Sequence, residues 1–92
     1  MQLRWTQEAA ADLDRIANYF FDNVPERAEQ FTRQIYEAPN ALLTYPHRGR
    51  AGRKAGTREL VMTSLPYIIV YQVIGDTVNI ARVMHGAQDW PA

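Results

Sequence analysis

The sequence contains no cysteine among its 92 residues. Disulfide bonds, zinc sites with thiolate ligands and a cysteine nucleophile are therefore excluded, and a reducing compartment such as the cytoplasm is the expected location. Histidine is almost as scarce, because His47 and His85 are the only two, and they make a poor set of metal ligands. We therefore expect neither a metal nor another cofactor.

Long apolar runs are missing as well. The longest one, from Leu65 to Tyr71, spans seven residues and includes a proline, whereas a membrane-spanning helix needs about 18. The N-terminus lacks the basic segment followed by an apolar segment that marks a signal peptide. We expect a protein that has no membrane partner and is not exported.

What is present is the composition of a small globular protein. Hydrophobic residues make up 47% of the chain and charged residues 22%, as in folded rather than disordered proteins. A chain of this length is expected to form one domain, residues 1–92, that buries roughly 60 to 65% of its unfolded surface. Because little depth remains for a closed cavity, function is expected on the outer surface.

The net charge is zero, but the two signs are separated along the chain. Residues 1–40 carry four arginines and seven acids, whereas residues 41–92 carry six cations and three acids. Five of these six cations fall in a stretch that has no acid: Arg48, Arg50, Arg53, Lys54 and Arg58. Such a stretch can bind a polyanion or an acidic protein, although composition alone favours a solvated loop.

A short strand and a helix are predicted at the N-terminus. Residues 2–5 alternate between polar and apolar, as in a strand with one buried face. Apolar residues then recur every three or four positions over residues 7–22, which predicts a helix that the hydroxyl of Thr6 can cap. The charged residues of this helix, Asp12 among them, are expected on its solvated side.

A second helix is predicted from Pro25 to about residue 45. Proline suits the first turn of a helix because its missing amide proton is not needed there. Pro39 lies within the same apolar stripe and is expected to kink or divide the helix. Because the connection between the two helices is short, we expect an antiparallel hairpin.

The second half of the chain predicts a loop and three strands. Residues 46–57 are rich in glycine and basic residues and indicate the loop. Three β-rich segments follow at residues 58–64, 67–74 and 77–84, and Gly75-Asp76 favours a type II′ hairpin turn between the last two. The predicted fold class is α+β, of the order βααβββ, with the helical hairpin packed on one face of a mainly antiparallel sheet.

The common catalytic motifs are missing. The chain has no HExxH, no GxSxG and no glycine-rich phosphate loop that leads into a helix. What remains is a group of hydrogen-bonding cations near the end of the predicted sheet, namely Arg58, Arg82 and His85. Arginine can bind a phosphate and histidine can transfer a proton near neutral pH. Alternation along a strand, however, puts Arg82 and His85 on opposite faces, so they can equally be ordinary strand residues.

Four segments carry the most specific family signal: Gly49-Arg50-Ala51-Gly52, Gly56-Thr57-Arg58-Glu59-Leu60, Pro66 to Tyr71, and Arg82 to Trp90. In this order and spacing they resemble the RelE/ParE toxin superfamily, and the chain is most similar to the ParE branch of plasmid-stabilisation toxins. The resemblance covers nearly the whole chain. It implies the toxin half of a type II toxin-antitoxin module, with a small ParD-like antitoxin encoded by the adjacent gene.

The resemblance implies two alternative activities. RelE-like members cut messenger RNA in the ribosome, whereas ParE-like members inhibit DNA gyrase and lack the nuclease residues. Arg58, Arg82 and His85 match the positions of nuclease residues, but Gly86 rather than a tyrosine follows, and Lys54 is the only lysine of the loop. We therefore expect gyrase inhibition by binding, without catalysis. An RNA-cleaving enzyme is the alternative, and a nontoxic module that only pairs with its antitoxin is the third.

Partner-binding residues are expected in two places. An amphipathic antitoxin helix is expected in the groove between the helical hairpin and the sheet, on apolar residues rimmed by arginines. Trp90 is expected to be packed, or else to anchor a partner, because of its large apolar area. The residues expected to contact the target are Arg48, Arg50, Arg53, Lys54, Arg58, Arg82, His85 and Trp90.

Overall fold

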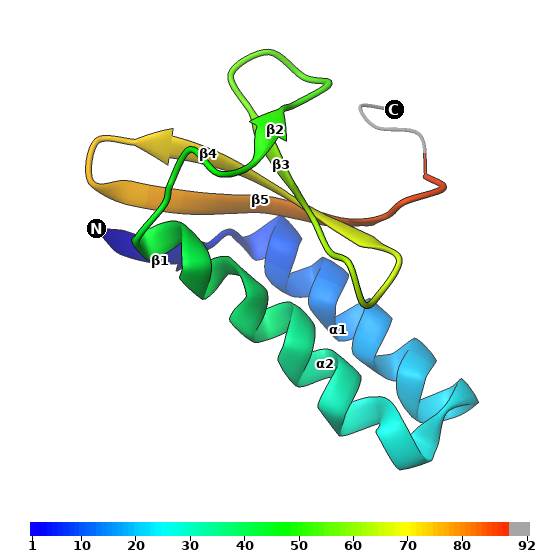
Figure 1. The fold of residues 1–92 in the computed structure, drawn as a ribbon. Helices are drawn as coiled ribbons and strands as arrows, with labels where there is room; N and C mark the ends of the chain where they lie inside the picture. The colour runs from blue at the N-terminus through cyan, green and yellow to red at the C-terminus, as the bar shows by residue number, and fades with distance from the viewer. Residues whose placement is uncertain (89–92) are drawn as a thin grey trace.

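A five-stranded sheet and a pair of helices form two layers in the computed structural model (Figure 1). The structure describes residues 1–88. In chain order the elements are β1 (Gln2–Trp5), α1 (Gln7–Asn23), the 3₁₀ helix η1 (Pro25–Arg27), α2 (Ala28–Glu37), the 3₁₀ helix η2 (Ala38–Leu43), β2 (Arg50–Ala51), β3 (Arg58–Val61), β4 (Tyr67–Ile74) and β5 (Thr77–His85). The predicted α+β fold is confirmed, and the short strand β2 is an addition within the predicted loop.

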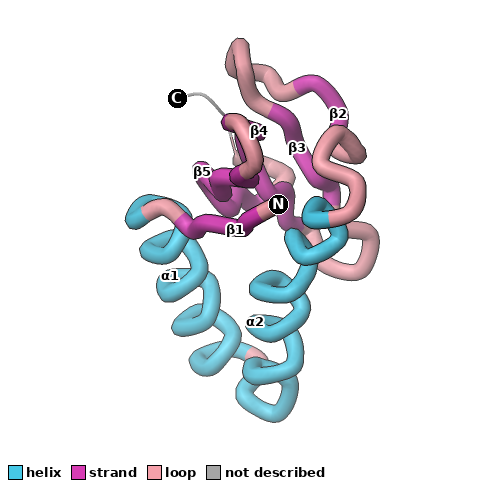
Figure 2. The backbone as a smooth tube through the Cα atoms, turned by 90° about the vertical axis from the view of Figure 1, so that its left-hand side faces the viewer, coloured by secondary structure: helices cyan, strands magenta, loops and turns pink. Residues whose placement is uncertain are grey.

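The sheet has the strand order β1-β5-β4-β3-β2, in which only the β1–β5 pair is parallel. Both helices lie on the same side of it (Figure 2). Gly75 joins β4 to β5 with a φ of 60°, and Asp76 has no positive φ, as the predicted type II′ turn requires. A register shift between Val70 and Tyr71 places a bulge in the β4–β5 ladder.

Helix α1 begins as predicted and buries apolar residues at helical spacing, but Asp12 also lies on its buried face. The Thr6 hydroxyl accepts a hydrogen bond from the Ala9 amide at 3.2 Å and caps the helix. The buried residues of α1 are Ala9, Asp12, Ile16 and Phe20. The expectation that Asp12 faces solvent is therefore wrong, because its side chain is only 2% exposed.

The predicted break at Pro39 is confirmed. Helix α2 ends at Glu37, and the chain continues as the 3₁₀ helix η2 with the proline ring buried. The apolar stripe survives the break, because Ile35 before it and Leu42 after it are both fully buried. The interruption thus changes the helix type and keeps the packing against the sheet.

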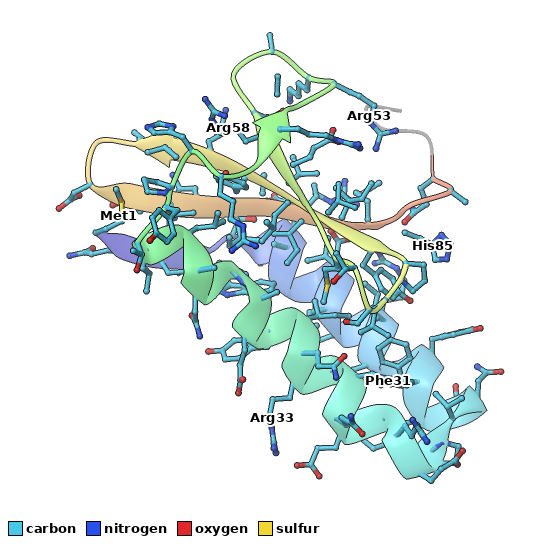
Figure 3. The ribbon with its side chains drawn as sticks, viewed as in Figure 1. Met1, Phe31, Arg33, Arg53, Arg58 and His85 are labelled. Carbon is cyan, nitrogen blue, oxygen red and sulfur yellow. The ribbon has the colours of Figure 1, made fainter. Side chains whose placement is uncertain are left out.

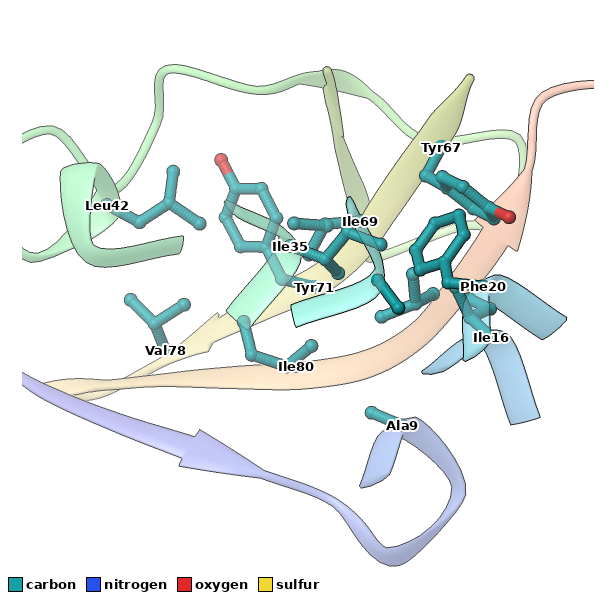
Figure 4. Close-up of a cluster of buried hydrophobic side chains, with 12 residues drawn as sticks. Ala9, Ile16, Phe20, Ile35, Leu42, Tyr67, Ile69, Tyr71, Val78 and Ile80 are labelled. Carbon is teal, nitrogen blue, oxygen red and sulfur yellow. The ribbon is translucent and has the colours of Figure 1, made fainter. Parts of the chain in front are cut away.

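The main core lies between the helices and the sheet (Figure 4). Among residues 1–88, Tyr71 is the largest fully buried side chain. Its hydroxyl accepts a hydrogen bond from the Gly49 amide at 2.9 Å and donates one to the Pro46 carbonyl at 2.8 Å. A Cβ at Gly49 would lie 2.6 Å from this hydroxyl, so only glycine fits there. Tyr71 therefore ties the start of the basic loop to the core.

Candidate functional site

The basic loop is organised around one buried carboxylate. The side chain of Glu59 is fully buried, on the face of β3 that alternates with the core-facing Leu60. Arg50 donates from Nε and Nη2 to Oε1 at 3.1 and 2.9 Å. Arg53 donates from its backbone amide and from Nε to Oε2 at 3.0 and 3.2 Å. We call these three residues the Glu59 cluster.

The Glu59 cluster shapes the loop and still presents charge. Burial alone would raise the pKa of Glu59, but the hydrogen bonds from Arg53 and Arg50 outweigh it, so the pKa lies below its ordinary value of 4.5. The side chains of Arg50 and Arg53 remain 58% and 40% exposed. The carboxylate thus fixes one side of each guanidinium while much of the side chain still faces solvent.

Arg58 also supports the loop. Its Nη1 donates to the carbonyls of His47 and Gly49 at 3.2 and 2.9 Å. The Lys54 carbonyl in turn accepts a hydrogen bond from the Thr57 hydroxyl at 2.6 Å. The stretch predicted from composition as a solvated loop is therefore held by specific bonds, and Figure 3 shows Arg53 and Arg58 among its side chains.

A second buried carboxylate joins α1 to β5. Strand β1 pairs with β5 only as far as Ile80, so the edge of β5 beyond that point has no strand neighbour in residues 1–88. Asp12 lies at this edge and accepts hydrogen bonds from the Val83 amide at 2.9 Å and from Arg82 Nε and Nη2 at 2.7 and 3.0 Å. Arg15 adds a further bond at 2.7 Å. We call these residues the Asp12 cluster.

The bonds to Asp12 give Arg82 a structural role. Burial alone would raise the pKa of Asp12, but the bonds from Arg82, Val83 and Arg15 outweigh it, so the pKa lies below its ordinary value of 3.8. The same bond raises the pKa of Arg82. The burial of Asp12 and Glu59 was not predicted from the sequence, because an acid on a helix or strand is normally solvated. For Asp12 the one sequence feature that indicated burial was its i, i+4 spacing to the apolar Ile16.

The three residues that match nuclease positions are not brought together. Arg58 lies opposite Tyr71 and His85 opposite Tyr67, so they are four residues apart along β4 and two strands apart across the sheet. With strand geometry this means about 13 Å along the strands and about 10 Å across them. Arg82 pairs with Val70, which forms a small second apolar cluster with Ile68 and Met84. The Tyr67 partner of His85 belongs instead to the main core between the helices and the sheet. The predicted separation of Arg82 and His85 onto different faces is thus confirmed.

His85 lies in a cleft of about 410 Å³ between α1 and the end of β5, which we call the α1-side cleft. Its ring meets Tyr67 edge-on at 5.5 Å, and its Nδ1 accepts a hydrogen bond from the Ala87 amide at 3.1 Å. Trp90 lies outside the described residues. The cleft is lined by Arg15, Ile16, Tyr19, Phe20, Pro66, Tyr67, Val83, His85 and Gln88.

Within residues 1–88 no group of three or more histidine, cysteine, aspartate or glutamate side chains is arranged to hold a metal ion. No helix in the same range has the length and apolarity to cross a membrane.

The two buried carboxylates predict a stability that falls in acid. Their pKa values are lowered in the folded state, so their stabilisation is complete above the ordinary values of 3.8 and 4.5 and is lost as the pH falls through the lower folded values. We expect a nearly constant Tm at mildly acidic pH and a steep fall below about pH 4. Thermal unfolding against pH checks this, and a Tm that rises in acid would contradict it.

Comparison with known proteins gives a consistent result. The sequence model of the family described as "ParE toxin of type II toxin-antitoxin system, parDE" matches residues 3–90. A protein of Sinorhizobium fredii (strain NBRC 101917 / NGR234) named "Putative toxin Y4kP" is 43% identical over 90 residues, which cover 98% of this chain and 93% of that protein. A solved chain of the "Chromosomal ParDE TA system from P. aeruginosa" superposes with a TM-score of 0.85 at 31% identity, over 92% of this chain and 95% of that one.

Proposed function

We propose, from the premise that this chain belongs to the ParE family of type II toxin-antitoxin systems, that a ParD-like antitoxin encoded by the adjacent gene neutralises it. We further propose that the free toxin inhibits DNA gyrase by binding. Both proposals rest on surfaces of the described residues and not on a catalytic centre.

The α1-side cleft supports the antitoxin proposal. Ile16, Phe20 and Tyr67 supply apolar walls, and Tyr19 at the same place is 59% exposed although it is aromatic. The side chain of Arg15 is 62% exposed at the rim. An amphipathic helix with apolar residues on one face and acids beside them complements this surface.

Gyrase binding is favoured over RNA cleavage by one observation, the dispersal of Arg58, Arg82 and His85. A ribonuclease must place a base, an acid and charge stabilisation around one phosphate. Here Arg82 is bound to Asp12. The partners of Arg58 and His85 on β4 are four residues apart, and the two residues lie on strands on either side of β4. A basic loop on a rigid frame, by contrast, can bind an acidic surface without any proton transfer.

The proposal predicts that the purified toxin inhibits supercoiling by gyrase and leaves ribosome-bound messenger RNA intact. The charge reversal Lys54→Glu in the basic loop should weaken inhibition about tenfold, because it replaces attraction by repulsion at the contact. Arg27→Glu is the matched control, since it makes the same charge change at an exposed residue of η1. Inhibition is measured on relaxed plasmid in the presence and absence of the antitoxin.

Three other results would change the proposed function. Cleavage of messenger RNA that His85→Ala abolishes, with supercoiling unaffected, would make the chain an RNA-cleaving enzyme instead. Growth unaffected by expression of the toxin alone, together with stable antitoxin binding, would leave the nontoxic pairing module. Equal effects of Lys54→Glu and Arg27→Glu would remove the basic loop from the gyrase contact.

A further inference from the structure

One face of the sheet has no helix of residues 1–88 packed on it, because α1 and α2 both lie on the other side (Figure 2). Alternation along the strands identifies the residues of the uncovered face. Arg4 of β1, Asn79 of β5 and Gln72 of β4 each lie between two residues of the main core and therefore point away from it. We call this surface the helix-free face.

A row of polar residues crosses the helix-free face. Arg4 lies opposite Asn79, and Asn79 lies opposite Gln72. The row continues to the loop of residues 52–57, because a Cβ at Gly56 would lie 3.7 Å from Nε2 of Gln72. This loop stands out from the sheet on the side away from the helices (Figure 1). Since the loop carries Arg53 and Lys54, the row has cations at both ends and two amide side chains between them.

Charge is divided between the two layers. Residues 7–43, which form the helical layer, contain three arginines and seven acids, whereas the rest of the chain contains seven cations and three acids. On the helix-free face, the side chain of Glu59 is fully buried and already bound by Arg50 and Arg53. A protein of zero net charge thus presents an excess of positive charge on its sheet side, and this field attracts a polyanion.

Aromatic residues distinguish a double-stranded from a single-stranded polyanion. Single-stranded nucleic acids bind by stacking their bases on aromatic side chains. The aromatic residues of the five strands are Trp5, Tyr67 and Tyr71, and all three pack with the main core on the opposite side of the sheet. The strands therefore offer the helix-free face no stacking platform, and a duplex, whose phosphates alone are exposed to such a surface, is the better fit.

A protein partner is disfavoured because the centre of the helix-free face has no exposed apolar residue within residues 1–88. Protein interfaces depend on apolar and aromatic side chains at their centre. Val70 lies at the middle of this face and is completely buried. Val61 and Ile74 are exposed but lie at opposite ends, because the partner of Val61 on β4 is six residues from Ile74. The surface between them is polar and cationic, which suits phosphate contacts.

We propose that the helix-free face binds the phosphate backbone of duplex DNA, with Arg53 and Lys54 on one strand of the duplex and Arg4 on the other. Four strand spacings separate β1 from β2, which gives about 19 Å between their backbones and spans a major groove about 12 Å wide. Gln72 and Asn79 lie between the cations and donate further bonds. Phosphate contacts carry no sequence information, so binding is independent of sequence. This activity needs only the toxin and DNA, and therefore goes beyond gyrase inhibition.

Fluorescence anisotropy of a short labelled DNA duplex tests the proposal with purified toxin alone. We expect a dissociation constant of about 10 μM at about 0.1 M salt, in the range of sequence-independent binding. A plot of log K against log salt should have a slope of about −3, because three neutralised phosphates release their counterions. Duplexes of different sequence should bind equally. Absence of binding at low salt, or a slope near zero, would overturn the proposal.

The decisive variant is Arg4→Gln, because Arg4 is exposed on β1 and lies outside the basic loop. Its loss should weaken duplex binding about fivefold and reduce the salt slope by about 1. Arg27→Gln is the matched control, since it makes the same charge change at an exposed residue of the helical layer. Its affinity should stay within about twofold of the wild type. An unchanged Tm of both variants confirms folding, and equal effects on binding would contradict a contact at the helix-free face.

Two comparisons separate this proposal from its alternatives. Single-stranded DNA or RNA of the same length should bind more weakly than the duplex, and tighter binding of a single strand would overturn the choice of a duplex. Supercoiling assays of the same variants separate the proposal from gyrase inhibition. Duplex binding that Arg4→Gln weakens, in a toxin that does not inhibit gyrase, supports the DNA site and removes the proposed function. Gyrase inhibition by a toxin that binds no duplex does the reverse.

Discussion

Replacement of Asp12 by alanine is expected to lower the free energy of unfolding by about 3 kcal/mol, one of the two largest effects predicted for this chain. The carboxylate accepts bonds from Arg82, Arg15 and the Val83 amide. Its loss would leave the buried Val83 amide without an acceptor and would remove the carboxylate bound to Arg82, whose side chain is 31% exposed. The value lies at the lower end for a broken buried ion pair because water still reaches Arg82.

The control for this prediction lies two residues away. Asp14→Ala removes the same group from an exposed position of α1, and its effect should stay within about 0.5 kcal/mol. Chemical denaturation of both variants gives the comparison. Equal and small effects would show that Arg82 and Val83 find other partners, and that the Asp12 cluster does not join α1 to β5.

Replacement of Glu59 by alanine is expected to cost about 2 kcal/mol and to loosen the basic loop. The Arg53 amide would lose its acceptor, and both guanidiniums would lose the carboxylate that orients them. The cost is smaller than at Asp12, because Arg50 and Arg53 are already about half exposed and can return to water. Faster amide hydrogen exchange at residues 50–57 measures the loosening directly.

Two further variants serve as comparisons for Glu59→Ala. Glu59→Gln keeps the size of the side chain and one acceptor oxygen, so it should retain the fold better than alanine while weakening the hold on the arginines. Glu29→Ala breaks the exposed pair with Arg33, in which both side chains are more than half exposed, and should cost about 0.5 kcal/mol at most. If Glu59→Ala leaves exchange in the loop unchanged, the bonds of Tyr71, Arg58 and Thr57 hold the loop without the Glu59 cluster.

The local elements were predictable from the sequence because each is dictated by neighbouring residues. Thr6 caps α1, Pro39 ends the α-helical part of the second helix, and Gly75 turns β4 into β5. Capping, the missing amide proton of proline and the freedom of glycine at positive φ all act within a few residues. The family was also predictable, since its signature segments are contiguous in the sequence and spaced along nearly the whole chain.

Strand β2 and the end of β3 were not predictable in the same way. Residues 58–64 are predicted as one strand, yet β3 ends at Val61 because the chain bends at residues 63–66 before it enters β4. Arg50 and Ala51 become a strand only because Glu59 and Arg58 lie opposite them. Whether a segment forms a strand depends on the strand that pairs with it, and that partner is set by the tertiary fold.

By itself, then, the sequence determined which segments are helix, strand and turn, apart from β2 and the end of β3, together with their order along the chain and the toxin family. Only the tertiary structure decided the roles of the charged residues: Asp12 holds Arg82, Glu59 holds Arg50 and Arg53, and Arg58 and His85 lie apart. The physical reason is range. Helix periodicity and turn chemistry act over a few residues, whereas Asp12 and Arg82 are 70 residues apart and meet only because β5 has an edge beyond β1 that α1 covers.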